Sequence, residues 1–193
     1  MTRCLVLFAH PCEESFSSAL HKTVVDTLEN RGWQVDDLNL YAEGFDPVLT
    51  TEERRNYHET SINCGPVQAY VDRIRAAEAL VMVHPVWNFG YPAILKGFFD
   101  RVFLPGVSFH LEDGQLTPAL DNIRRFAVVT TYGATRLKAF LAGDPPRRIA
   151  TRMLRRTFRP ERLKYLALYD MNNAGPADHQ AFLARTRRAM ETL

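Results

Sequence analysis

Apolar runs of strand length alternate with helix-length amphipathic segments along most of this chain. The clearest runs cover residues 3–9, 79–84 and 124–131, and each is followed by a loop and then by a helical pattern. Near-continuous apolar runs are typical of strands covered on both faces, and helical connections between them indicate parallel pairing. The alternation therefore predicts an α/β fold, a five-stranded parallel sheet with helices on both faces.

The remaining segments complete this plan. Two further strands are expected, at 33–40 and 163–170. Six helical segments are expected as well, at 15–31, 51–58, 65–77, 92–103, 135–158 and 177–193. The segment at 135–158 is predicted to be broken at residues 144–146. Residues 104–122 look like a small hairpin or extended excursion around Asp113-Gly114. Because the chain has 193 residues and neither an internal repeat nor a linker, we expect one domain over residues 1–193.

Charge and cysteine content exclude several classes of function. A net charge of +2 argues against nucleic acid as the main partner. The basic cluster at 147–159 alternates with apolar residues, which favours a solvated helix face. The first apolar run is too short for a signal peptide or a transmembrane segment. Cys4, Cys12 and Cys64 have no paired spacing, which indicates free thiols in a cytoplasmic protein.

Ligands of parallel α/β sheets bind beyond the carboxyl ends of the strands. This rule selects three loops, and the first runs from His10 to Phe16. It contains neither a dinucleotide-binding glycine motif nor a P-loop. Its serines stand where a helix begins, so free backbone N–H groups, hydroxyls and His10 can bind a phosphate there. Ordinary capping of the helix by Ser15 explains the same residues equally well.

The second loop is the uncharged, aromatic stretch HPVWNFGYP, which begins at His84. Trp87 and Phe89 can form a wall for a flat ligand such as a flavin ring, and Gly90 permits close approach of the backbone. A buried connection or a subunit contact accounts for the same composition. The third loop follows the strand at 124–131 and offers hydroxyls and backbone N–H groups.

Other chemistries lack their residues. No G-x-S-x-G elbow of a hydrolase is present. The six histidines are scattered, without a spacing typical of metal ligands, so we expect no metal site.

Taken together, three motifs resemble the NAD(P)H:quinone oxidoreductases of the flavodoxin-like superfamily, over about residues 3–135. They are His10-Pro11 with Ser15-Phe16-Ser17, the run P-x-W-x-F-x-x-P-A-I-L-K-G-x-F-D-R-V-F from Pro85 to Phe103, and Thr130-Thr131-x-Gly133. The resemblance implies a flavodoxin-like three-layer sandwich that binds FAD, or FMN in some branches. It also implies a two-step ping-pong reaction, in which a hydride passes from NAD(P)H to the flavin and then to a quinone or another small aromatic acceptor. Members of this family are homodimers.

By position, the resemblance assigns three groups of flavin contacts. Those to the phosphates are His10, Ser15, Phe16 and Ser17; those along the isoalloxazine ring are Pro85, Val86, Trp87, Asn88 and Phe89; those at its pyrimidine edge are Thr130, Thr131, Tyr132 and Gly133. The chain departs from the family at Ser17, where an Asn is common. It also lacks the Tyr and His that stabilise the reduced flavin in the best-known members. The catalytic proton carrier is therefore unknown, with Arg136 or Tyr132 as candidates.

Two alternatives to quinone reduction stay open. Azo or nitro compounds can serve as the acceptor in the same chemistry. Some relatives are flavin-bearing regulatory subunits of membrane transporters, and the basic cluster at 147–159 would then be a docking surface.

Overall fold

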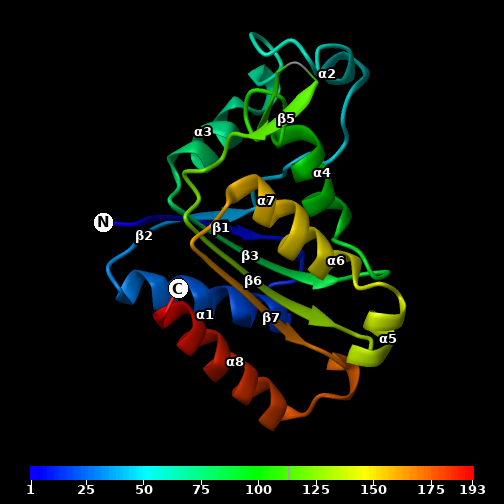
Figure 1. Cartoon of the computed structure of the whole chain (residues 1–193). Helices are drawn as coiled ribbons and strands as arrows, with labels where there is room; N and C mark the ends of the chain where they lie inside the picture. The colour runs from blue at the N-terminus through cyan, green and yellow to red at the C-terminus, as the bar shows by residue number, and fades with distance from the viewer. Residues whose placement is uncertain (113) are drawn as a thin grey trace.

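The computed structural model describes residues 1–112 and 114–193, and a five-stranded parallel sheet lies at its centre (Figure 1). The spatial order is β2-β1-β3-β6-β7, and every adjacent pair is parallel; the strands are β1 Arg3–Phe8, β2 Gln34–Asn39, β3 Ala79–Val86, β6 Arg125–Tyr132 and β7 Arg162–Leu168. Because β1 pairs with β2 on one side and with β3 on the other, the winding reverses at β1. The α/β prediction and all five strands are confirmed; a single domain over residues 1–193 stays a prediction.

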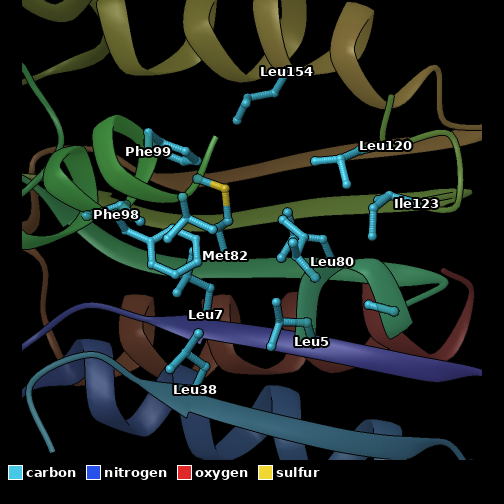
Figure 2. Packing of buried hydrophobic residues seen from close by; sticks show 14 of the residues in the cluster. Leu5, Leu7, Leu38, Leu80, Met82, Phe98, Phe99, Leu120, Ile123 and Leu154 are labelled. Atoms are coloured by element: carbon cyan, nitrogen blue, oxygen red, sulfur yellow. The ribbon is translucent and has the colours of Figure 1, made fainter. Parts of the chain in front are cut away.

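Helices cover both faces of the sheet, which confirms the three layers. On one face, α1 (Phe16–Asn30) and α8 (Pro176–Glu191) pack side by side (Figure 1). The other face carries α3 (Gln68–Ala76) and α4 (Ala93–Val102), with the later helical segments beside them. Alternate residues of each central strand enter the two cores. Figure 2 shows the core between the sheet and α4. Leu5, Leu7, Leu80 and Met82 of the strands pack there with Phe98 and Phe99 of α4.

Two predicted helices are shorter than expected. The segment predicted at 51–58 is helical only as α2 (Thr51–Arg55), which begins with a capping box of Thr50 and Glu53 and ends at Asn56. The helix predicted at 65–77 begins as a 3₁₀ turn, η1 (Gly65–Val67), before α3. Propensity alone does not fix such ends, because tertiary packing decides where a short helix stops.

The excursion at 104–122 contains a two-stranded antiparallel hairpin of β4 (Phe109–Glu112) and β5 (Gln115–Pro118). Asp113, in the predicted turn, lies outside the described residues. Val107, just before the hairpin, is buried within its own chain, whereas Leu111 and Leu116 are exposed and directly opposite each other.

The connection from β6 to β7 is helical in four pieces: α5 (Arg136–Leu141), α6 (Pro145–Arg148), the π-helical η2 (Ile149–Leu154) and α7 (Arg155–Phe158). The predicted break is present. Asp144 adopts a left-handed conformation with φ of 43°, and Pro145 opens the next helix. After β7, a 3₁₀ turn, η3 (Met171–Asn173), leads to α8. No helix in the described part of the chain has the length and apolar character needed to cross a membrane.

Candidate functional site

A cavity of about 490 Å³ lies at the carboxyl ends of β1, β3 and β6 and joins the three loops selected from the sequence. Its lining contains ten residues that the sequence predicts: His10, Ser15, Phe16, Ser17, Pro85, Val86, Trp87, Asn88, Thr131 and Gly133. Two further residues, Met171 and Asn172, come from the turn after β7. The side chains of Phe89, Thr130 and Tyr132 do not line the cavity.

The amino end of α1 provides donors for an anion. The Ser15 hydroxyl caps the helix by accepting the Ser18 N–H at 3.1 Å, so ordinary capping is present. The backbone N–H groups of Phe16 and Ser17 nevertheless have no acceptor among the described residues, and both residues line the cavity. Glu13 is exposed and borders a neighbouring hollow instead of the cavity, as does Glu14. A phosphate in the cavity would therefore meet donors at the end of the helix without these carboxylates in the lining.

His10 is oriented by its own loop. Its Nδ1 accepts the backbone N–H of Cys12 at 3.0 Å, which leaves the ring proton of the neutral histidine on Nε2. The ring also packs edge-on against Trp87, with centroids 5.7 Å apart. His10 is thus fixed as a hydrogen-bond donor at the junction of the first and second loops.

The aromatic loop after β3 closes in a two-residue turn. Trp87 and Gly90 exchange two backbone hydrogen bonds of 3.2 and 2.8 Å across Asn88 and Phe89, whose φ angles are 48° and 57°. Positive φ at both central residues defines a type I′ turn, in which Asn is favoured but a bulky residue is strained by about 1–2 kcal/mol. Trp87 and Phe89 are 40% and 41% exposed, so the loop is not a buried connection.

Alternation along β6 separates its terminal residues. Thr131 is directed to the cavity, whereas Thr130 and Tyr132 are buried on the opposite face of the sheet. The Tyr132 hydroxyl donates to Asp144 Oδ1 at 2.7 Å and accepts from the Tyr165 hydroxyl at 2.6 Å. Burial, the neighbouring Tyr165 and the Asp144 carboxylate raise the pKa of Tyr132 far above its ordinary value. Tyr132 is therefore a neutral structural group, which removes it as a proton carrier for the cavity.

A polar cluster behind the third loop fixes the start of α6. Arg147 donates from Nε to Asp144 Oδ2 at 3.1 Å and from its guanidinium to the Tyr169 hydroxyl at 2.9 Å. Its guanidinium also lies 4.2 Å from the centre of the Tyr165 ring. Through Tyr132, this cluster holds the backbone of the third loop in place. Arg136, the other candidate proton carrier, is exposed at the start of α5 and does not line the cavity.

Sequence reasoning missed Met171 and Asn172. A Cβ on Gly133 would lie only 3.2 Å from Asn172 Nδ2, so the Asn172 amide packs directly against the third loop. The loop after β7 is also at the carboxyl edge of the sheet, and the rule that selected the other three loops could have included it.

The donor set fits a phosphorylated cofactor with a flat ring. A helix end and His10 line one part of the cavity, and the exposed Trp87 with Thr131 and Gly133 lines another. Within residues 1–112 and 114–193, the structure contains no cluster of three or more potential metal ligands.

Comparisons with known proteins agree with this geometry. A family model described as "Flavodoxin-like fold" matches residues 2–193. An uncharacterized NAD(P)H oxidoreductase of Haemophilus influenzae is 34% identical over 119 residues, which cover 61% of this chain and 58% of that protein. An FMN-dependent NADH:quinone oxidoreductase of Hahella chejuensis is 30% identical over 115 residues, covering 60% of this chain and 54% of that protein. The chain thus spans little more than half the length of these relatives.

A solved structure matches almost end to end. The NAD(P)H:quinone oxidoreductase from Methanothermobacter marburgensis superimposes with a TM-score of 0.86 and 25% sequence identity, and the match covers 98% of each chain.

Proposed function

Because this chain belongs to the flavodoxin-like fold family, we propose that it is a flavin-dependent NAD(P)H:quinone oxidoreductase. The single observation that carries the proposal is the cavity, which brings three separate loops together with phosphate donors at one part and an aromatic turn at another. The names of the relatives support the same activity. A bound flavin supplies the redox chemistry, accepting a hydride from NAD(P)H and passing it to a quinone or another small aromatic acceptor.

The residues of this chain bind and orient the cofactor. His10 Nε2–H and the N–H groups at the start of α1 would hold its phosphate oxygens. Trp87 and Asn88 of the aromatic turn would support the ring, while Thr131 and Gly133 would lie at its polar edge. FAD is the proposed cofactor, with FMN as the alternative that one relative's name supports.

We further propose a homodimer formed through the aromatic loop and the hairpin. Leu111 and Leu116 form an exposed cross-strand pair at the hairpin, 54% and 67% accessible. A mainly apolar groove of about 460 Å³ next to it is lined by Phe103, Phe109 and Met153 among others. A second copy would cover these surfaces. The three free cysteines support a reducing location, the cytoplasm.

The decisive experiment uses purified protein supplied with FAD or FMN and then desalted. We expect retained flavin absorbance, bleaching by NADH or NADPH without oxygen, and recovery on addition of a quinone. His10→Ala should weaken flavin binding, whereas His110→Ala, an exposed histidine on the hairpin, should not. Absence of flavin absorbance after desalting would refute the proposal.

A further inference from the structure

We propose that α5 and the arginine-bearing face of η2 and α7 dock on the surface of an anionic phospholipid membrane, whereas Met153 on another face of the same segment lines the groove assigned to the second copy. Two features adjacent in the chain carry this inference, a stripe of arginines and a triad of protruding apolar side chains. Neither belongs to the cofactor cavity.

The arginine stripe follows one face of the helical segment from α6 to α7 and consists of Arg148, Arg152, Arg155, Arg156 and Arg159. All five are exposed, and none forms an ion pair with a described residue. The core face of the same segment holds Ala150, Leu154 and Phe158. The stripe is therefore the solvent face of a helix that is anchored on its other side.

Charge is strongly segregated in this protein. Residues 145–160 contain six of the 24 basic residues and none of the 22 acidic ones, so the rest of the chain carries four more acidic than basic residues. A nearly neutral molecule thus presents one cationic face. Such a face attracts an anionic surface in a defined orientation.

The apolar triad lies on α5 and consists of Leu137, Phe140 and Leu141, which are 66%, 69% and 74% exposed. Isolated exposed apolar residues are common, but three large ones on a six-residue helix form a patch. The guanidinium of Arg148 reaches to about 4.0 Å from the Cβ position of Gly143, two residues after α5 ends. The stripe therefore begins where the triad ends, and Figure 1 shows α5 joined by a short loop to the helical segment that runs from α6 to α7.

An anionic bilayer satisfies both features at once. Leucine and phenylalanine side chains insert at the boundary between headgroups and acyl chains, and arginines bind lipid phosphates. An acidic protein surface would satisfy the arginines alone. The inference goes beyond the proposed function and rests on it in one respect: α5 begins three residues after Gly133 of the cavity, so docking would bring a lipophilic quinone close to the site.

The test is co-sedimentation of the flavin-supplied protein with vesicles of phosphatidylcholine alone or with 30% phosphatidylglycerol. We expect binding to the anionic vesicles only, weakened by raised salt. Each arginine near such a surface contributes roughly a factor of five in partition, so R152Q/R155Q/R156Q should bind roughly 100-fold more weakly. The matched control is R185Q/R187Q/R188Q, which removes three exposed arginines from α8 on the opposite face of the sheet and should bind as the wild type does.

Phe140→Ser tests the apolar triad and should weaken binding several-fold without changing its salt dependence. Equal binding to both vesicle types, or equal losses in the two triple variants, would overturn the proposal. So would dissociation of a dimer by Phe140→Ser with vesicle binding unchanged, because the triad would then be a subunit contact. Binding to soluble polyglutamate but not to vesicles would assign the stripe to an acidic protein. Vesicle binding is measured without turnover, so its outcome is independent of whether the protein reduces quinones.

Discussion

Replacing Phe89 by glycine separates a binding role of the aromatic turn from a packing role. Phe89 has a φ of 57°, a conformation that glycine adopts freely and phenylalanine adopts only with strain. Its side chain is 41% exposed at the tip of the turn. We expect Phe89→Gly to leave the stability of the protein almost unchanged and to weaken binding of the flavin or the acceptor.

The magnitudes follow from exposure and conformation. Complete burial of a phenylalanine is worth about 2–3 kcal/mol, so partial burial of Phe89 contributes about 1.5 kcal/mol. The added freedom of glycine in the unfolded chain costs about 0.7 kcal/mol more. Relief of the left-handed strain at position 89 stabilises the variant by about 1–2 kcal/mol. The net loss in free energy of unfolding is therefore about 1 kcal/mol or less. Phe89 lies outside the lining of the cavity, so its exposed ring is available to a ligand at the rim, and losing that contact should weaken binding of the ligand by ~10–100-fold.

The assay measures both quantities on the same preparations. Urea denaturation of flavin-free protein gives the free energy of unfolding without the contribution of bound ligand, and titration of flavin fluorescence with kinetics of quinone reduction gives binding. Phe99→Ala is the contrast, because Phe99 is 7% exposed in the core of α4 and its truncation should cost about 3–5 kcal/mol. If Phe89→Gly binds flavin and quinone normally but unfolds much more easily, the turn is only a packing element.

Three further predictions concern other positions. Burial lowers the pKa of His84 to about 4, although its hydrogen bond to the Pro85 carbonyl acts in the opposite direction. Neutral His84 therefore stabilises the fold fully above pH 6.5, and this contribution is lost as the pH falls to 4. At about 1.4 kcal/mol per pH unit, the loss in free energy of unfolding is about 3 kcal/mol. Urea denaturation between pH 4 and 6.5 should show a free energy of unfolding that depends less on pH in His84→Gln than in the wild type, whereas the exposed His58→Gln should behave as the wild type does. Gly133→Ala should weaken flavin binding several-fold in titrations, because the new Cβ would lie only 3.2 Å from the Asn172 amide. The double variant Gly133→Ala/Asn172→Ala should restore binding, and a double variant that still binds weakly would contradict this contact. Leu116→Ser should dissociate the dimer in light scattering and leave the secondary structure of the chain unchanged, and a variant that stays dimeric would count against the hairpin interface.

The sheet was predictable because its signals are local and redundant. Each central strand is a continuous apolar run, and the order of the elements then leaves few topologies. The same rule located most of the cavity, since carboxyl ends of parallel strands meet at one edge. These inferences require no knowledge of side-chain contacts.

The remaining features depend on tertiary contacts that no local pattern contains. The left-handed backbone at Asp144 is held by Tyr132 and Arg147, which are 12 and 3 residues away from it in sequence. Strand alternation separates Thr131 from Thr130, but only the packing of α1 on one face of the sheet decides which of the two lines the cavity. Asn172 enters the site from η3, the turn after the edge strand β7. The carboxyl-edge rule reaches this loop, but no residue in its sequence distinguishes a binding turn from a structural one.

The aromatic, uncharged character of the loop after β3 follows from two requirements that act on the same four residues. The type I′ turn needs positive φ at both central positions, which Asn88 adopts with little strain and Phe89 only with strain. Folding alone would favour glycine or asparagine at both positions, and a solvent-exposed tip would favour polar side chains. A strained, half-exposed phenylalanine next to an exposed Trp87 opposes both preferences. Partial burial of Phe89 and its left-handed strain are of similar size, so packing within one chain gives phenylalanine little advantage over glycine at this position. The proposed flavin site and subunit contact are the two candidates for that advantage, and the glycine substitution at position 89 measures their contribution.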